Sequence, residues 1–378
     1  MPQAFKGTLS AHAAAGAMGR GCRAAFPNAE IIELPMADGG DDTLDVLVAN
    51  TGGRLSEASV RGPLGEDVRA EWGVLGDGRT AVIEMARASG LRLLDPERLD
   101  PLATTTYGTG QLIREALDSG YRDILVGVGG SATIDGGAGA VSALGVRFLD
   151  ADGGPFPPCG GALRRLATID VSGLDARVAD ARIRVACDVD IPFVGPTGPR
   201  NFMAQKGCDD TAIDLLTAGL EHYCRAVAGA TGVDLRAMPM SGPAGGLAGG
   251  LHAFLDAELA AGAKLVLDTM GLDQRLAGAD LVLVGEGCLD GGTLSGKGTL
   301  GVAHAARDAG VPALAICGEI EPALPDLRPH GIVASLALAG PQHSANEARA
   351  RAAELVEETT NYAVLAQLSH PGVGSAGL

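Results

Sequence analysis

A glycine-rich loop between an apolar run and a helical pattern is the feature that most constrains this chain. The apolar run is Asp123–Gly127, the loop spans residues 128–137, and an alanine-rich helical pattern follows. Because glycines leave the loop backbone uncrowded, its N–H groups can point at an anion above the start of the helix. We therefore expect a site for a small phosphate or carboxylate compound, beside one loop carboxylate, Asp135. Its candidate binding residues are Gly129, Gly130, Ser131 and Thr133.

The composition narrows the class of ligand. The chain of 378 residues has 57 glycines and a formal net charge of −17, and it contains no block of Lys and Arg. Nucleic-acid-binding proteins show a basic face, so we expect neither a nucleic acid nor an anionic membrane surface as partner. The seven cysteines form no C-x-x-C pair and no apolar leader is found, which favours a reducing compartment. We therefore expect a cytoplasmic protein that binds small molecules.

Strand and helix patterns alternate regularly from Lys264 onward and predict an α/β fold. Strands are expected at 264–268, 280–285, 311–317 and 331–338, with helices at 299–309 and 345–368. This alternation is typical of a doubly wound parallel sheet. A short strand is also expected at 30–34. No strand precedes the first loop and helix, so we expect the N-terminal segment to pack with the C-terminal units. The predicted domains are 1–60 with 262–378, and an inserted domain at 61–261.

Three carboxylates and two glycines follow the strand expected at 30–34, in the sequence Asp38-Gly-Gly-Asp-Asp42. Asp38 at the carboxyl end of a strand can hold Mg²⁺ or accept a proton, while Gly39 and Gly40 leave room for a ligand. Alternatively, the carboxylates suit the first turn of the next helix, which we favour for the last two of them. Lys6 precedes another helix, where it either adds a cation to an anion site or is an ordinary surface lysine.

Two loops in the middle of the chain carry further candidates. Asp188 ends an apolar strand, where it is either a metal ligand or part of a solvated strand end. Lys206 follows a Pro/Gly loop and can reach a phosphate, although a surface lysine fits the same pattern. Gly245 and Gly246 open a helix, where glycines permit either close approach of a ligand to the backbone or tight packing of the helix.

The segment 281–298 nearly matches a phosphate-binding loop. An apolar strand ends in Glu286, and Asp290 precedes Gly291-Gly-Thr-Leu-Ser-Gly-Lys-Gly298. The pattern G-x-x-x-x-G-K-[ST] fails at its last place, because Gly298 lacks the hydroxyl that binds Mg²⁺. We therefore do not expect a P-loop NTPase, but Lys297 can still face a phosphate, and Glu286 and Asp290 are candidate metal ligands.

Taken together, these loops resemble those of the bacterial glycerate kinase family, and the resemblance covers the whole chain. It is carried by Phe5-Lys-Gly-Thr-Leu-Ser-Ala11, Pro35-Met-Ala-Asp-Gly-Gly40, Gly62-Pro-Leu-Gly65, Ile83-Glu-Met-Ala86, Thr106-Tyr-Gly-Thr-Gly-Gln111, Gly129-Gly-Ser-Ala-Thr133 with Asp135-Gly-Gly137, Gln205-Lys-Gly207, Gly285-Glu-Gly287 and Gly296-Lys297. It implies a three-layer, Rossmann-like domain built from both chain ends, and an inserted α/β domain with a mixed sheet. The implied enzyme uses ATP and Mg²⁺ to phosphorylate D-glycerate, usually to 2-phosphoglycerate, in the cleft between the domains.

The resemblance also suggests roles for the candidate residues. Asp38 or Asp135 accepts the proton of the substrate hydroxyl, and Lys6 neutralises charge on the transferred group. The metal ligands are Asp188, Glu286 and Asp290. The nucleotide phosphates or the substrate carboxylate are held by the glycine loops together with Lys206 and Lys297. Which loop holds the nucleotide stays open, as does the choice between a monomer and a homodimer.

The chain departs from the family pattern at several positions. Ile134 and Ile191 stand where the family has asparagine, the family's Ser-Gln pair is replaced by Gly291 and Gly292, and its first strand with the following Asp-Ser pair is replaced by a start at Met1 with Gln3 and Ala4. Losing a hydrogen-bonding group that faces a ligand can cost about 1–3 kcal/mol. Two alternatives follow: a kinase of another small hydroxy acid, or a catalytically impaired relative that binds ligand.

Overall fold

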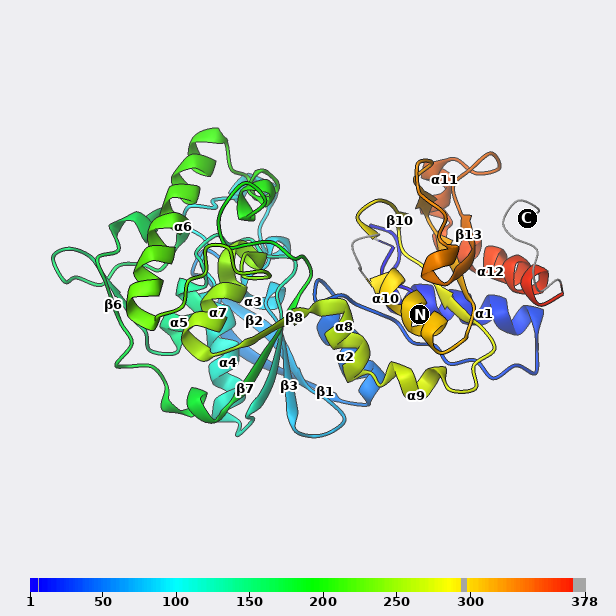
Figure 1. Cartoon of the computed structure of the whole chain (residues 1–378), viewed down its shortest axis with the longest axis horizontal. Coiled ribbons are helices and arrows are strands. Elements are labelled where there is room, and N and C mark those ends of the chain that lie inside the picture. Colours follow the sequence, from blue (N-terminus) through cyan, green and yellow to red (C-terminus); the bar gives the residue numbers. More distant parts are fainter. Residues whose placement is uncertain (6, 294–297, 370–378) are drawn as a thin grey trace. The chain divides into compact units, whose positions relative to one another are not determined.

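The computed structural model describes residues 1–5, 7–293 and 298–369 (Figure 1). The chain forms two compact units: unit 1 combines Met1–Asp38 with Ala263–Leu378, and unit 2 is Gly39–Gly262. Both units are α/β, as the sequence predicts. The predicted division placed residues 39–60 with the chain ends. In the structure this segment lies in unit 2, because its strand β1 (Arg54–Arg61) pairs along its whole length with β2 (Asp67–Val74).

Unit 2 is built on a six-stranded mixed sheet in the order β1-β2-β3-β4-β7-β8. β2 pairs antiparallel with β1 and β3, whereas β3, β4, β7 and β8 run parallel to one another. The remaining strands of the unit are β3 (Thr80–Glu84), β4 (Asp123–Gly127), β7 (Arg182–Cys187), β8 (Glu258–Ala261) and a separate antiparallel pair, β5 (Arg147–Leu149) with β6 (Thr168–Asp170). The carboxyl ends of the parallel strands therefore meet at one edge, where open α/β sheets bind their ligands.

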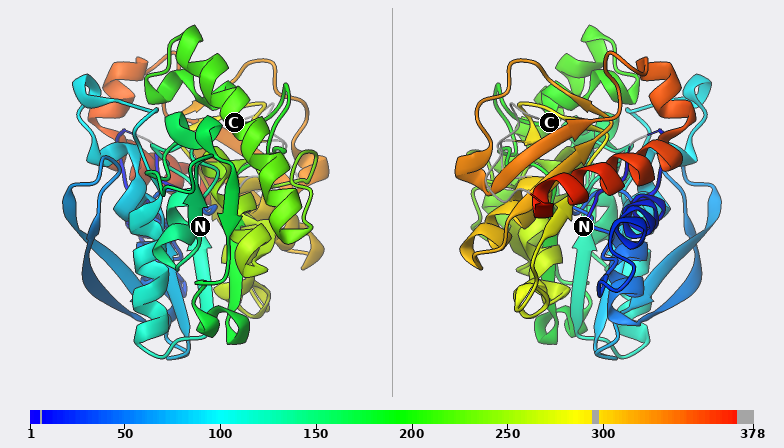
Figure 2. Two further views of the ribbon diagram at one scale, coloured as in Figure 1. Left: turned by 90° about the vertical axis from the view of Figure 1, so that its left-hand side faces the viewer. Right: turned by 90° about the vertical axis from the view of Figure 1, so that its right-hand side faces the viewer.

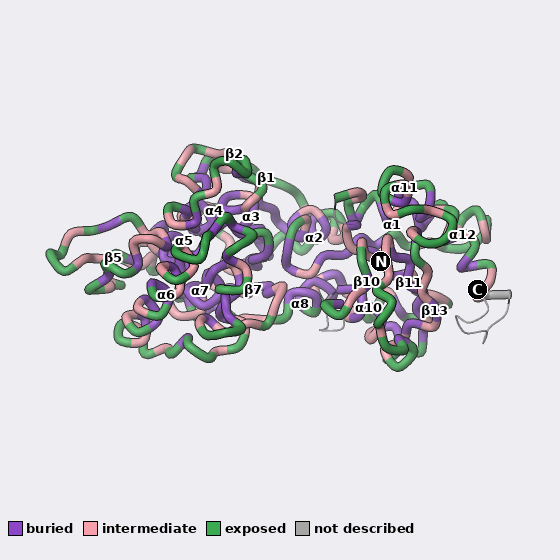
Figure 3. The backbone as a smooth tube through the Cα atoms, turned by 90° about the horizontal axis from the view of Figure 1, so that it is seen from above, coloured by how far each residue is buried: buried purple, intermediate pink, exposed green. Residues whose placement is uncertain are grey.

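The helices of unit 2 pack on this sheet and on one another. They are α2 (Thr43–Thr51), α3 (Ala86–Ser89), α4 (Tyr107–Asp118), α5 (Ala138–Ala143), α6 (Asp210–Thr231) and α7 (Leu247–Leu255). α4 is amphipathic as predicted, because Leu112, Ile113 and Leu117 recur at helical spacing and are buried. β3 is buried along its whole length, as expected for a central parallel strand, and Figure 3 shows the buried backbone inside the unit.

Unit 1 contains a smaller parallel sheet in the order β13-β11-β9, made of β9 (Val282–Val284), β11 (Ala313–Cys317) and β13 (Ile332–Ala337). A short parallel pair is formed by β10 (Cys288–Leu289), which follows β9 in the chain, and β12 (Glu319–Ile320), which follows β11. The helices are α1 (Ala11–Ala25), α8 (Gly262–Thr269), α9 (Leu272–Leu276), α10 (Gly298–Asp308), α11 (Ala345–Ala350) and α12 (Ala352–Ser369). Within the described ranges of the whole chain, none of the helices is long and apolar enough to cross a membrane.

The N-terminal segment extends the sheet of unit 1. Pro2 forms a parallel bridge with Gly285, and the Gln3 N–H donates to the Gly285 carbonyl at 2.8 Å. On one face of the sheet, Leu314 and Ile316 of β11 pack against α12, and α1 also lies on that face (Figure 2). α10 connects β9 to β11 and contacts both, and right-handed crossover places it on the other face. The unit is thus doubly wound, and its topological switch lies between the N-terminal segment and β9.

Two predicted strands are wrong. Residues 30–34 form no strand, and the next segment is joined to the N-terminal segment by a bond from the Met36 N–H to the Pro2 carbonyl at 2.9 Å. A longer ladder is prevented there because proline has no N–H to donate. Residues 264–268 lie within helix α8, because a short apolar run fits a buried helix as well as a strand.

Candidate functional site

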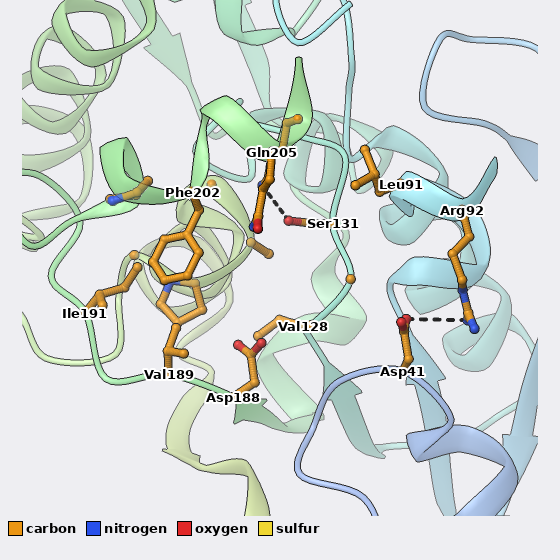
Figure 4. A pocket seen from close by; sticks show the side chains of 18 of the residues that line it. Asp41, Leu91, Arg92, Val128, Ser131, Asp188, Val189, Ile191, Phe202 and Gln205 are labelled. Carbon is orange, nitrogen blue, oxygen red and sulfur yellow. Dashed lines mark hydrogen bonds and ion pairs between the residues drawn. The ribbon is translucent and has the colours of Figure 1, made fainter. Parts of the chain in front are cut away.

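Unit 2 contains a cavity of about 540 Å³ at the carboxyl end of its parallel strands. Six of the predicted site residues line it: Gly129, Gly130, Ser131, Asp188, Lys206 and Gly245. They come from the loops after β4 and β7, from the turn at Ala204–Lys206 and from the turn before α7. The structure therefore brings together, within one unit, residues that are more than a hundred positions apart in the sequence (Figure 4).

The loop of Gly39 and Gly40 packs closely against the loop of Gly129 and Gly130. The Gly129 N–H donates to the Gly39 carbonyl at 3.1 Å, and a Cβ at Gly129 would lie 2.3 Å from the Cα of Gly40. Gly130 has φ +72°, and a Cβ there would lie 2.4 Å from the carboxylate of Asp41. Gly39 and Gly40 thus support the loop that lines the cavity. Glycine is required here because no side chain fits between the two loops.

The second glycine loop packs against the first one. Gly245 accepts a hydrogen bond from the Gly136 N–H at 3.0 Å, and a Cβ on Gly245 would lie 2.1 Å from the Thr133 carbonyl. Gly246 lies against Phe193 and Gly136. Of the two interpretations of this loop, tight packing describes Gly246, whereas Gly245 both packs and lines the cavity.

Lys206 is a buried cation at the wall of the cavity. Lys206 is 5% exposed, and its Nζ donates to Ser131 Oγ at 2.7 Å and to the Thr133 carbonyl at 2.9 Å. Burial lowers the pKa of Lys206 to about 8, although the carboxylate of Asp188 and other neighbouring groups raise it. The lysine is therefore still charged at neutral pH. An ammonium has three N–H bonds, so the third can donate to an anion in the cavity.

Asp135 lies in the interior of unit 2 rather than at the cavity. It is 0% exposed, and its carboxylate accepts hydrogen bonds from the Thr106 N–H at 2.7 Å, the Gly137 N–H at 3.0 Å and the Gly139 N–H at 3.2 Å. Burial raises the pKa of Asp135, and these hydrogen bonds lower it. The anion at the start of α5 is thus the side chain of Asp135 itself. Asp135 therefore uses the N–H groups at this helix start, and the predicted binding of an anion by the loop stays a prediction for Gly129, Gly130 and Ser131, which line the cavity.

The other hydroxyl and isoleucine positions of these loops divide between core and cavity. Thr133 is buried and offers its carbonyl to Lys206. Ile134 is fully buried in the core, whereas Ile191 lines the cavity. Of the two positions at which the family has asparagine, only the one at Ile191 can therefore alter what the cavity recognises.

A charged network that the sequence reasoning missed lies at one end of the cavity. Arg92 is half-exposed and lies 3.2 Å from Glu84 and 3.5 Å from Asp41, and Figure 4 marks the second pair. A hydrogen bond from the Leu91 N–H to the Gly130 carbonyl at 2.9 Å holds this segment beside the glycine loop. Glu84 is 0% exposed, so burial raises its pKa to about 7, although Arg87 lowers it. The only sequence signal for the network was the Ile83-Glu-Met-Ala86 motif.

Unit 1 holds the remaining carboxylates that the sequence singles out. Glu286 follows β9, and its Oε1 is buried without a hydrogen-bond partner among the described residues. Burial raises the pKa of Glu286, hydroxyls of nearby threonines lower it, and the carboxylates of Asp290 and Asp38 raise it further. Asp290 accepts hydrogen bonds from the Gly292 N–H at 2.7 Å and the Thr293 N–H at 3.1 Å, so it also shapes its own loop.

Some predicted roles lie beyond this geometry. Lys6 and Lys297 are outside the described residues. In the part of the chain that the structure describes, no group of three or more His, Cys, Asp or Glu side chains could hold a metal ion. Mg²⁺ commonly binds one or two carboxylates together with substrate phosphates, so a pair such as Glu286 and Asp290 fits that mode of binding.

Comparison with known proteins identifies close relatives. The glycerate kinase family profile matches residues 1–368. A glycerate kinase of Bacillus subtilis is 45% identical over 359 residues, which are 95% of this chain and 94% of that protein. A glycerate 2-kinase of Escherichia coli is 45% identical over 332 residues, 88% of this chain and 87% of that protein. A crystal structure of a protein assigned as glycerate kinase 2, from Salmonella typhimurium, superposes with a TM-score of 0.84 at 42% identity. It covers 97% of this chain and 96% of that one.

Proposed function

Because this chain belongs to the glycerate kinase family, a family of phosphotransferases that act on a hydroxyl group, we propose that it transfers the γ-phosphoryl group of ATP to D-glycerate. The proposed product is 2-phosphoglycerate, in line with the name of the relative from Escherichia coli. The observation that carries the proposal is the buried ammonium of Lys206 at the wall of the cavity, because a desolvated cation binds a phosphate or carboxylate strongly.

Phosphoryl transfer requires positioning and charge neutralisation more than covalent chemistry. In the proposed reaction, the glycerate hydroxyl oxygen bonds to the γ-phosphorus while the bond from that phosphorus to the bridging oxygen of ADP breaks. The hydroxyl proton passes to a carboxylate. We assign this role to Asp38, which is half-buried, rather than to Asp135, whose carboxylate is enclosed and hydrogen-bonded. Lys6 and Lys297 are proposed to neutralise charge on the phosphates.

Mg²⁺ fits the carboxylates that are present. The unpartnered buried Oε1 of Glu286 is a suitable ligand atom, with Asp290 close enough to raise the pKa of Glu286. Asp188 is the corresponding candidate at the cavity of unit 2. When bound, Mg²⁺ would supply positive charge to the nucleotide phosphates. We further propose that the enzyme works in the cytoplasm as a monomer or homodimer, on small molecules rather than nucleic acids or membranes.

Product identification tests the proposal. The full chain is incubated with ATP, Mg²⁺ and D-glycerate, and the product is identified by ³¹P NMR against authentic 2- and 3-phosphoglycerate. A 2-phosphoglycerate signal is expected. A 3-phosphoglycerate signal would contradict the proposed position of transfer, and no phosphoglycerate from folded protein would contradict the proposed activity.

A second candidate is a kinase of another small hydroxy acid. Ile191 favours it in the case that the acceptor acid binds in this cavity, because this apolar side chain lines the cavity where the family pattern has asparagine. A panel of hydroxy acids compared by kcat/KM separates the two proposals. D-glycerate should give the highest value under the first proposal, and a different acid should give it under the second.

A further inference from the structure

The cavity of unit 2 has two chemically different ends. Figure 4 shows the ring of Phe202 with Val189 and Ile191 at one end, and Asp41 with Arg92 at the other. Asp188 and Ser131 lie between these ends, and Lys206 donates to Ser131. A ligand that fills the cavity therefore has an apolar part and a part that accepts a hydrogen bond from the buried ammonium of Lys206.

The size of the cavity argues against glycerate as its sole occupant. Ligand pockets of about 300–1,000 Å³ hold drug-sized molecules, and this cavity measures about 540 Å³. Glycerate is a three-carbon acid without an apolar part, so it would fill a small fraction of the space and leave the apolar end empty. A nucleoside di- or triphosphate has both the size and the division into a flat base and an anionic tail.

Phe202 is suited to contact a flat base. Among the described residues that line the cavity it is the aromatic one, and its side chain is half-buried. Other rings of unit 2 are used in the core, where Tyr223 packs against Phe148 and Phe193. An aromatic face at the wall of a cavity stacks on any nucleobase, and the contact is strongest for a large one.

Phe202 and Lys206 lie on one short, well-tied segment. Phe202 ends the turn Pro199–Phe202, and Lys206 ends the turn Ala204–Lys206. The Met203 N–H donates to the Arg200 carbonyl at 3.3 Å, and the Lys206 N–H donates to the Met203 carbonyl at 3.0 Å. The apolar contact and the cation are therefore held at a fixed separation, as a base and the phosphates attached to it require.

We propose that this cavity is the nucleotide site of the kinase, with the purine base of ATP on Phe202 and its phosphates at Lys206, beside the loop of Gly129 and Gly130. The inference rests on the proposed function and goes beyond it by assigning the nucleotide to one of the two competing glycine-rich regions.

The experiment measures binding of ADP and of pyrophosphate to the full chain by isothermal titration calorimetry, with Mg²⁺ present. Phe202→Leu removes the ring but keeps an apolar side chain, and Phe202→Tyr keeps the ring. Leu93→Ala is the matched control, because Leu93 is exposed and does not line the cavity. Thermal unfolding verifies that each variant is folded, and the ADP release of the wild-type chain with D-glycerate tests the proposed function separately.

Phe202→Leu should raise the Kd for ADP about tenfold and leave the Kd for pyrophosphate within about twofold, because base stacking is lost and the phosphate contacts remain. Phe202→Tyr and Leu93→Ala should bind both probes as the wild type does. Lys206→Met should weaken both probes. The assignment would be overturned if folded Phe202→Leu bound ADP as the wild type does, or if it lost affinity for pyrophosphate and ADP equally. It would also be overturned if the wild-type chain turned over glycerate while neither Phe202→Leu nor Lys206→Met changed the Kd for ADP.

Discussion

Lys206→Met tests directly whether the cavity wall contains a buried charge. Burial lowers the pKa of Lys206 from 10.5 to about 8. That difference corresponds to about 3 kcal/mol, at roughly 1.36 kcal/mol for each pKa unit, by which the folded state disfavours the charged lysine at neutral pH. Methionine has a similar shape and no charge, so it removes this cost. It also removes the donor of the buried Thr133 carbonyl, which costs about 1–3 kcal/mol at every pH.

The pH dependence separates these two effects. Because the pKa of Lys206 is lower in the folded than in the unfolded chain, the unfolded chain binds more protons between about pH 8 and 10.5. The cost of the buried charge is therefore present in full below pH 8 and is relieved as the pH rises through that window. At pH 7 the variant should be as stable as the wild type or slightly more stable. At pH 10 it should be less stable by about 1–3 kcal/mol, because only the lost hydrogen bond remains.

Urea unfolding at pH 7 and pH 10 measures this difference. The chain has a single tryptophan, Trp72, which is buried in β2, so its fluorescence reports on the unfolding of unit 2. Lys264→Met is the control, because Lys264 is an exposed lysine of α8 and its loss should have little pH-dependent effect on that signal. A stability difference between Lys206→Met and the wild type that is the same at both pH values would refute a buried, charged Lys206.

Three further predictions test the remaining assignments. Burial raises the pKa of Glu84 from 4.5 to about 7, so the wild type should lose up to about 3 kcal/mol of stability as the pH rises through this window, and Glu84→Gln should lack that loss in urea titrations. Asp38→Asn should lower kcat about 100-fold or more at an unchanged melting temperature, whereas Asp135→Asn should lower the free energy of unfolding by about 3 kcal/mol; the opposite pattern would move the base to Asp135. Gly129→Ala should weaken ADP binding, because its Cβ would lie 2.3 Å from the Gly40 Cα. Gly229→Ala, in open space on α6, should stabilise the chain by about 0.5–1 kcal/mol. Equal affinities of the two variants for ADP in titration calorimetry would contradict the close packing at Gly129.

Much of the fold could be predicted because its signals are local. The strand–glycine loop–helix unit at 123–143 and the amphipathic helix α4 follow from periodicity and glycine placement. Strand pairing is not local, so the sequence did not show that residues 30–34 lack a ladder. The strand predicted at 264–268 was wrong, because these residues lie in helix α8 and an apolar run this short does not distinguish a strand from a buried helix.

The candidate site was predicted in part for the same reason. Glycine loops mark where backbone approaches backbone, and this identified the walls of the cavity at Gly129 and Gly245. The sequence did not show that Asp135 turns inward to cap α5, because burial depends on what packs around it. Phe202 and Arg92 were missed, because a lone aromatic and a lone arginine become site residues only through the loops that position them.

The proposed kinase activity is tested most directly by ADP release from the full chain, followed in a coupled assay with ATP and Mg²⁺, with and without D-glycerate. We expect release that depends on D-glycerate and saturates with it, and that falls about 100-fold or more in Asp38→Asn. Folded protein that releases no ADP in response to D-glycerate would show that the chain does not phosphorylate this acid.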